Sequence, residues 1–150
     1  MKEFIIPEQI KRMIGDVVVK RAFRLAPNDT SEMANKINYR IEGDSIFIYC
    51  DSDHAYDMEY GRPPGDLSSS EKEDINDWAR RHGIKNGRGV AKTIERSGIK
   101  AGTPQNPMHI TSFGRNSYRP FMRPALIQSL PIIKKIIRSS FRWQHIIFMT

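Results

Sequence analysis

The chain has 150 residues and a mass of 17.3 kDa, a length that suits a single domain. Its 39% hydrophobic and 27% charged residues are typical of a folded globular protein, and they exclude a collagen, a mucin stalk and a fully disordered tail. The formal net charge is +7, and the one cysteine, Cys50, excludes an intramolecular disulfide framework and a four-cysteine zinc site.

Residues 8–26 are predicted to form a helix that Pro7 begins and Pro27 ends. Its apolar residues recur at spacings of three and four, which places them on one stripe: Ile10, Met13, Ile14, Val17, Val18, Ala22 and Leu25. Several basic residues, Lys11 and Arg12 among them, fall largely off that stripe. The stretch 27–31 is rich in turn-forming residues.

Two strands joined by a tight turn are predicted next. Residues 37–42 alternate apolar and polar side chains, and residues 46–50 form a β-branched and aromatic run. Between them Gly43 can adopt the positive φ that a hairpin turn requires. Because a lone hairpin is marginally stable, we expect it to pack on the first helix or to join more strands.

Short helices are predicted in the middle of the chain. Residues 54–60 form one, ended by Gly61. A second begins at a serine-rich stretch, where both Ser68 with Glu71 and Ser70 with Glu73 fit a capping box. Its predicted inner face is made of Ile75, Trp78, Ala79 and His82. After a loop at 85–89, residues 90–97 form a third short helix with Val90, Ala91 and Ile94 facing inward.

Residues 98–119 lack periodicity, and a loop of that length suggests an extended arm or a hairpin that contacts another subunit. A helical pattern then returns, carried by Met122, Leu126, Leu130, Ile133, Ile137 and Phe141. Pro131 is predicted to kink or split this helix. The predicted fold is therefore α+β, with a small hairpin-based antiparallel sheet packed with an N-terminal helix, short middle helices and a C-terminal helix. Residues 1–130 form the domain and residues 131–150 a helical extension.

Charge is distributed unevenly along the chain. Residues 51–77 hold 9 acidic and 2 basic residues, whereas residues 78–150 hold 14 basic residues and a single acidic one. A basic surface attracts nucleic acid, and an acidic patch on one copy attracts a basic patch on the next, which favours a head-to-tail ring. The charges can also intermix in three dimensions and simply keep the protein soluble.

An acidic run follows the second strand and suggests a metal site formed by Asp51, Asp53, His54 and Asp57. It does not match an EF-hand, because position six is Tyr56 and position twelve is Arg62. A metal-dependent hydrolase stays open on this ground, beside a solvated edge or the acidic half of a subunit contact.

No other motif points to catalysis. The four histidines lack zinc spacing, and Cys50 follows an apolar strand, which indicates a buried thiol rather than a nucleophile. The sequence contains no nucleophile elbow, phosphate loop or dinucleotide fingerprint. We therefore expect no catalytic residue, no metal and no cofactor. No apolar run approaches the roughly 18 residues of a membrane span, and no secretory signal is expected at the start of the chain.

Three segments, taken in order, resemble the tail-completion or neck proteins of tailed bacteriophages. These proteins carry a "YA…EfG…P" segment, which is similar to residues 54–64, and a "PFlrPAl" segment before the last helix, which is similar to residues 118–126. Upstream, residues 26–30 resemble the family's "aP…TG.L" segment, except that Ser31 and Met33 replace its glycine and leucine. The resemblance covers roughly residues 8–130.

The resemblance implies a virion protein that assembles into a homo-oligomeric ring, expected to be a hexamer, at the head–tail junction. It implies tail-terminator, tail-tube, head-closure and connector proteins as neighbours, genomic DNA passing through the centre, no catalysis and no membrane. The protein would occupy the host cytoplasm only during assembly. The motif residues expected to make family or assembly contacts are Tyr56, Glu59, Gly61, Pro120, Phe121, Arg123 and Pro124.

Within the second motif, the two prolines restrict the backbone, Phe121 fills a pocket and Arg123 can pair with a carboxylate, for which Glu59 is a candidate. The basic residues that could face DNA are Arg88, Lys92, Arg115 and Arg119. The main alternative to a neck protein is a nucleic-acid-binding module that uses the basic half of the chain.

Overall fold

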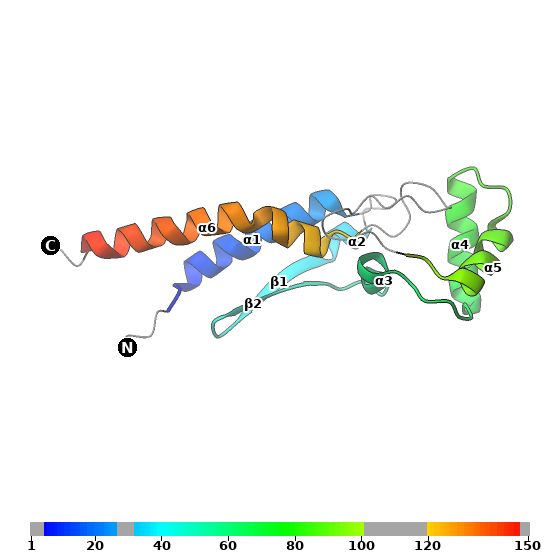
Figure 1. Cartoon of the computed structure of the whole chain (residues 1–150), viewed down its shortest axis with the longest axis horizontal. Coiled ribbons are helices and arrows are strands. Elements are labelled where there is room, and N and C mark those ends of the chain that lie inside the picture. The colour runs from blue at the N-terminus through cyan, green and yellow to red at the C-terminus, as the bar shows by residue number, and fades with distance from the viewer. Residues whose placement is uncertain (1–4, 27–31, 101–119, 148–150) are drawn as a thin grey trace.

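The computed structural model describes residues 5–26, 32–100 and 120–147, and Figure 1 shows how they are arranged. In these residues a two-stranded antiparallel sheet is combined with helices, so the predicted α+β fold is confirmed. The elements in chain order are α1 (Glu8–Leu25), α2 (Glu32–Asn35), β1 (Ile37–Glu42), β2 (Ser45–Cys50), α3 (Ala55–Tyr60), α4 (Ser69–Arg81), α5 (Gly87–Ser97) and α6 (Met122–Ile147).

The molecule is elongated, with its helices and hairpin in two groups (Figure 1). At one end α1 packs against the long α6 and also contacts both strands of the hairpin. At the other end α4 and α5 pack against each other, and α3 lies between the two groups. The helix α6 has 26 residues and α1 has 18, so α6 is about 12 Å longer and extends past the start of α1.

The hairpin forms as the sequence predicts. Ile37 pairs with Cys50 and Glu42 pairs with Ser45, which leaves a two-residue turn. In that turn Gly43 has a φ of +55°, a conformation that side-chain-bearing residues rarely adopt. The isoleucines and Tyr39 lie on the more buried face, toward α1, so the hairpin is stabilised by the first helix as expected.

Lys11 is buried, although its position off the apolar stripe suggested an exposed side chain. Its ammonium group donates to the carbonyl oxygen of Gly43 at 2.6 Å and to the carboxylate of Asp44 at 2.7 Å. The aliphatic stem therefore packs on the hairpin while the charge reaches polar partners at the turn. Met13, in contrast, is 45% exposed, although it belongs to the apolar stripe of α1 that was expected to be buried.

Helix α1 lies close to the hairpin at Gly15. A Cβ built there would lie 2.5 Å from a ring carbon of Tyr39, well inside van der Waals contact. We expect Gly15→Ala to destabilise the fold by about 2 kcal/mol, even though alanine favours a helix, because the ring and the strand must move. Urea denaturation measures this loss.

Gly65→Ala is the matched control, since nothing lies within 4 Å of a Cβ at that position. Its free energy of unfolding should change by less than about 0.5 kcal/mol. Equal losses in the two variants would show that the close approach of α1 to Tyr39 does not constrain the packing.

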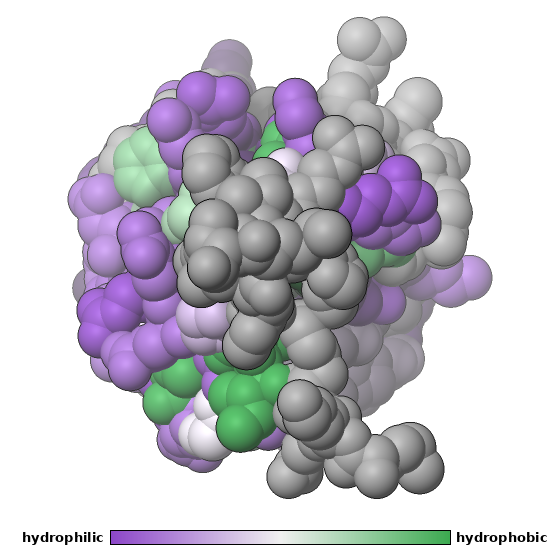
Figure 2. Space-filling model, turned by 90° about the vertical axis from the view of Figure 1, so that its left-hand side faces the viewer, coloured by the Kyte–Doolittle hydropathy of each residue, from purple (hydrophilic) through white to green (hydrophobic). Residues whose placement is uncertain are grey.

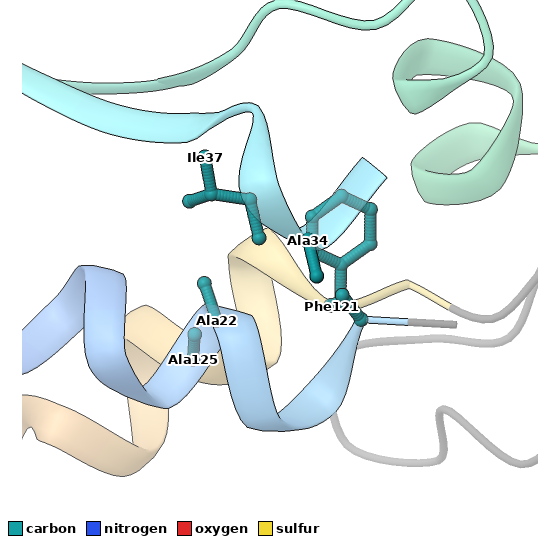
Figure 3. Close-up of a cluster of buried hydrophobic side chains, with 6 residues drawn as sticks. Ala22, Ala34, Ile37, Phe121 and Ala125 are labelled. Carbon is teal, nitrogen blue, oxygen red and sulfur yellow. The ribbon is translucent and has the colours of Figure 1, made fainter. Parts of the chain in front are cut away.

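The main hydrophobic core lies where α1, α2, β1 and the start of α6 meet. Figure 3 shows this cluster, with the α1 alanine lying near both the β1 isoleucine and the α6 alanine. Small side chains allow the two helices to approach, and a single aromatic ring fills the remaining volume. The buried members are Ala22, Ala26, Ala34, Ile37, Phe121 and Ala125.

The α4–α5 pair has its own smaller core, formed by Leu67, Ala91, Ile94 and Ile99. Of the two capping boxes that the sequence allows, Ser68 with Glu71 is the one that begins α4. The predicted loop at 85–89 is partly wrong, because α5 begins at Gly87. The side chain of Asn86 accepts a hydrogen bond from the Gly89 N–H at 2.9 Å and so caps the helix.

Three further predictions are corrected. Pro131 lies inside α6, so the predicted splitting of this helix is wrong. The stripe predicted to be the apolar face of this helix is turned partly outward, because the small Ala125 and Ser129 allow the closest contact with α1.

His82 was predicted on the inner face of α4, but it is exposed at the end of that helix, where it stacks on Trp78. The predicted arm lies mostly at 101–119, outside the described residues.

Candidate functional site

The two motifs that carry the family resemblance meet in space, although they are about 60 residues apart in sequence. Helix α3 carries the first motif and ends at Gly61, which is buried and has a φ of +80°. This left-handed conformation favours glycine, so it explains why glycine ends the helix at this point. The last turn of α3 thereby brings Glu59 against the first turn of α6.

Glu59 is buried, and its carboxylate caps the amino end of α6. It accepts hydrogen bonds from the backbone N–H groups of Phe121, at 2.6 Å, and of Met122. These amides have no partner within the helix, and the positive end of the helix dipole favours a negative charge there. A carboxylate from a distant helix thus takes the role that a local capping side chain usually has.

Arg123 completes this joint. Its Nε donates to the Glu59 carboxylate at 3.0 Å, and a terminal nitrogen donates to the Glu59 backbone carbonyl. The guanidinium also lies 4.4 Å from the centre of the Tyr60 ring, a distance at which cation–π attraction contributes. The predicted pairing of Glu59 with Arg123 is confirmed.

The remaining residues of the second motif are buried around the joint. Pro120, Phe121 and Pro124 are among the largest fully buried side chains in the described residues. Both prolines fix the backbone at the start of α6, and Phe121 enters the main core. Tyr56, in contrast, is 69% exposed and lies 4.8 Å from the Tyr60 ring, on the outside of α3. Of the seven residues expected to make family or assembly contacts, all of which the structure describes, Tyr56 is the one with a largely exposed side chain.

A second polar network links α3 to α4. The Arg62 guanidinium lies 2.5 Å from the Glu71 carboxylate and 3.6 Å from that of Asp57. Glu71 also accepts a hydrogen bond from the Ser68 N–H at 2.7 Å, as the capping box requires. The Ser68 amide, Arg62 and the Ser68 hydroxyl together lower the pKa of Glu71 from 4.5 to about 2.

This network predicts a dependence of stability on pH. A carboxyl group whose pKa is lowered in the folded state stabilises the fold above its unfolded pKa, and the effect disappears as pH falls from about 4.5 to about 2. We expect Glu71→Gln to be less stable than wild type at pH 6, with the difference shrinking toward pH 2. Urea midpoints at pH 6, 4 and 2 measure it, and a difference that stays constant across these values would contradict the assignment.

The basic residues expected to face DNA are only partly described. Arg88 and Lys92 lie exposed on α5, and Arg96, one turn further on, is exposed as well. These three residues are spaced four apart and so share one face of the helix. None of them forms an ion pair within the described residues. Arg115 and Arg119 lie outside those residues.

The acidic run after β2 does not form a metal site in the part of the chain that the structure describes. No group of three histidine, cysteine or acidic side chains lies close enough there to hold a metal ion. Asp57 instead faces Arg62, while Asp51 and Asp53 are exposed. Cys50 is half-buried and contacts the Met33 carbonyl, and burial raises the pKa of its thiol, which disfavours the nucleophilic thiolate.

Three features of the site were not predicted from the sequence. Arg123 contacts the ring of Tyr60. The signal for this contact was the position of Tyr60 next to Glu59, the predicted partner of Arg123. The pairing of Arg62 with Glu71 joins residues nine positions apart in a loop and a helix, so no periodicity indicates it. The backbone capping of α6 likewise depends on the tertiary approach of α3.

None of the described helices has the combination of length and hydropathy that a membrane span requires. Comparison with protein-family models, with curated proteins and with solved structures finds no significant match to this chain.

Proposed function

We propose that this chain is a structural virion protein of the neck of a tailed bacteriophage, where it forms a ring that joins the tail to the capsid around the DNA channel. Copies of the chain, tail-terminator or tail-tube proteins and head-closure or connector proteins are its partners. In this role it has no catalytic activity, and it passes through the host cytoplasm during assembly.

The observation that carries the proposal is that the described chain leaves large apolar side chains uncovered on two of its surfaces, one on α6 and one on the hairpin. Leu126 and Leu130 on α6 are 47% and 41% exposed, and Phe47 on β2 is 43% exposed. Figure 2 looks at the molecule from the end where α6 finishes and shows hydrophobic residues at a surface that is otherwise largely hydrophilic. Clusters of large apolar side chains at a surface mark sites of protein contact.

The joint between α3 and α6 supports the resemblance to neck proteins. Its two motifs supply both halves of one contact, Glu59 from the first and Phe121 with Arg123 from the second. Motifs that pair in this way have a shared structural reason to occur together. The joint also holds the first turn of α6 against α3 through a capped and ion-paired helix end.

A genetic complementation experiment tests the proposal. In a phage that carries this gene, an early stop codon should leave DNA-filled heads and complete tails that remain separate. Purified protein added to the lysate should restore infectious particles. Normal particle yield from the stop-codon phage would contradict the proposal.

The basic face of α5 favours a second candidate, a nucleic-acid-binding module. Arg88, Lys92 and Arg96 are exposed on one face and could contact successive phosphates. In the neck these residues would face DNA in the channel. A free binding module differs in that the isolated monomer would bind DNA, with an affinity that falls steeply as salt is added. Titration of a labelled duplex at 50 and 200 mM salt separates the two functions.

A further inference from the structure

The exposed stripe of α6 has a defined shape. Leu126 and Leu130 lie one turn apart, and the half-buried Ile133 and Ile137 continue the same face. Ala125 and Ser129 are buried on the neighbouring face toward α1. The helix is therefore apolar over a wider arc than α1 covers, and the stripe is about 17 Å long.

The outward face of the hairpin is the second uncovered surface. On the side of the sheet away from α1, Phe47 and Tyr49 are 43% and 38% exposed. The Arg40 guanidinium lies over both rings, 5.2 Å and 5.8 Å from their centres. Aromatic residues and arginine are the side chains most enriched in the cores of protein interfaces. The two strands span roughly 20 Å, close to the length of the α6 stripe.

The α6 stripe and the outward face of the hairpin lie on different sides of α1. Helix α1 contacts α6 and both strands of the hairpin, so it separates the long helix from the sheet (Figure 1). A contact between two different faces on separate sides of a subunit leaves one face of each kind free for another copy. Repetition of such a contact generates a ring when the rotation closes.

The charges of the two surfaces are also complementary. Helix α6 contains five basic residues and no acidic residue. Residues 37–53, which include the hairpin, contain four acidic residues and one basic residue. Glu42 pairs with Arg40 and Asp44 with Lys11, whereas Asp51 and Asp53 are exposed just after β2. Two copies of α6 facing each other would bring like charges together, whereas α6 against the hairpin brings opposite charges together.

We propose that the α6 stripe of one copy docks on the outward face of the β1–β2 hairpin of the next copy, and that this heterologous contact builds the ring. The inference rests on the proposed function, since it assigns the subunit contact within that ring. It assigns a role in assembly to Leu126, Leu130, Phe47, Tyr49 and Arg40.

Two variants, each with one surface disabled, test this contact. The α6 variant carries Leu126→Ser with Leu130→Ser, and the hairpin variant carries Phe47→Ser with Tyr49→Ser. Because all four residues are exposed, both variants should keep the wild-type circular dichroism spectrum. The matched control is Phe23→Ser, which changes a 49% exposed aromatic residue on α1 outside both surfaces.

Light scattering after size-exclusion chromatography should give a ring for wild type and for the control, and a 17.3 kDa monomer for each variant alone. An equal mixture of the two variants should give a dimer of twice that mass. In this dimer the intact α6 of one partner occupies the intact hairpin of the other, and no free surface remains.

The other outcomes overturn the inference in different ways. Dimers in the hairpin variant alone would show that α6 packs on α6, and dimers in the α6 variant alone would show that hairpins pack together. If wild type formed rings while the mixture of the α6 and hairpin variants stayed monomeric, this contact would be rejected, and the proposed function would still stand. A wild-type chain that stays monomeric, alone and with neck partners, would reject both.

Discussion

Replacing Phe121 with alanine is expected to lower the free energy of unfolding by about 4 kcal/mol. Phe121 is the largest of the fully buried side chains in the described chain, and it is the only aromatic residue among the buried members of the main core. The alanines around it cannot fill the space that a missing ring leaves, so most of the cavity should persist. Urea denaturation monitored by circular dichroism measures the loss.

Phe121→Leu should lose about 1–2 kcal/mol, because it keeps much of the apolar volume. Phe23→Ala serves as the surface control, since its ring is about half exposed, and it should lose under about 1 kcal/mol. A Phe121→Ala protein as stable as the surface control would mean that the main core is not formed around this ring.

Replacing Glu59 is expected to have the second largest effect. Glu59→Ala removes the acceptor for the Phe121 and Met122 amides and the ion-pair partner of Arg123, and should lower stability by about 3 kcal/mol. Glu59→Gln keeps the shape and one acceptor oxygen but loses the charge, and should lower stability by roughly half as much. Urea midpoints of the three proteins give these differences.

Glu73→Gln is the control for the loss of a glutamate charge, because Glu73 is exposed on α4 and belongs to neither hydrophobic core of the described residues. Its free energy of unfolding should match that of wild type within about 0.5 kcal/mol. If Glu59→Gln also matched wild type, the capping of α6 by this carboxylate would contribute nothing to stability, and the joint would lose its structural role.

Local rules were enough to predict much of the fold. The alternation at 37–42, the turn glycine Gly43 and the Ser68 capping box each act over a few residues, so the sequence alone locates the hairpin and the start of α4. The glycine that ends α3 is equally local, because its positive φ follows from the helix end.

Features that depend on tertiary packing could not be predicted in this way. Lys11 is buried because the hairpin turn supplies acceptors 32 and 33 residues away, and no helical pattern contains that information. Helix α6 is oriented about its own axis so that Ala125 and Ser129 face α1. These small side chains let the helix approach α1 more closely than the larger leucines would. The periodicity alone favoured the leucines, and so it indicated the wrong face.

The candidate site was predicted in part by resemblance and not by spacing. Glu59 and Arg123 lie 64 positions apart, and only the pairing of two motifs suggested that they meet. Helix α5 begins at Gly87 and not at the predicted residue 90, because Asn86 caps the helix.

The mass of the assembled protein tests the central claim most directly. Native mass spectrometry of the purified chain alone should give one discrete species whose mass is a whole-number multiple of 17.3 kDa and larger than a dimer, and after addition of neck partners it should give a complex that contains more than two copies of the chain. A species of 17.3 kDa under both conditions would contradict the claim that this chain is a ring-forming subunit.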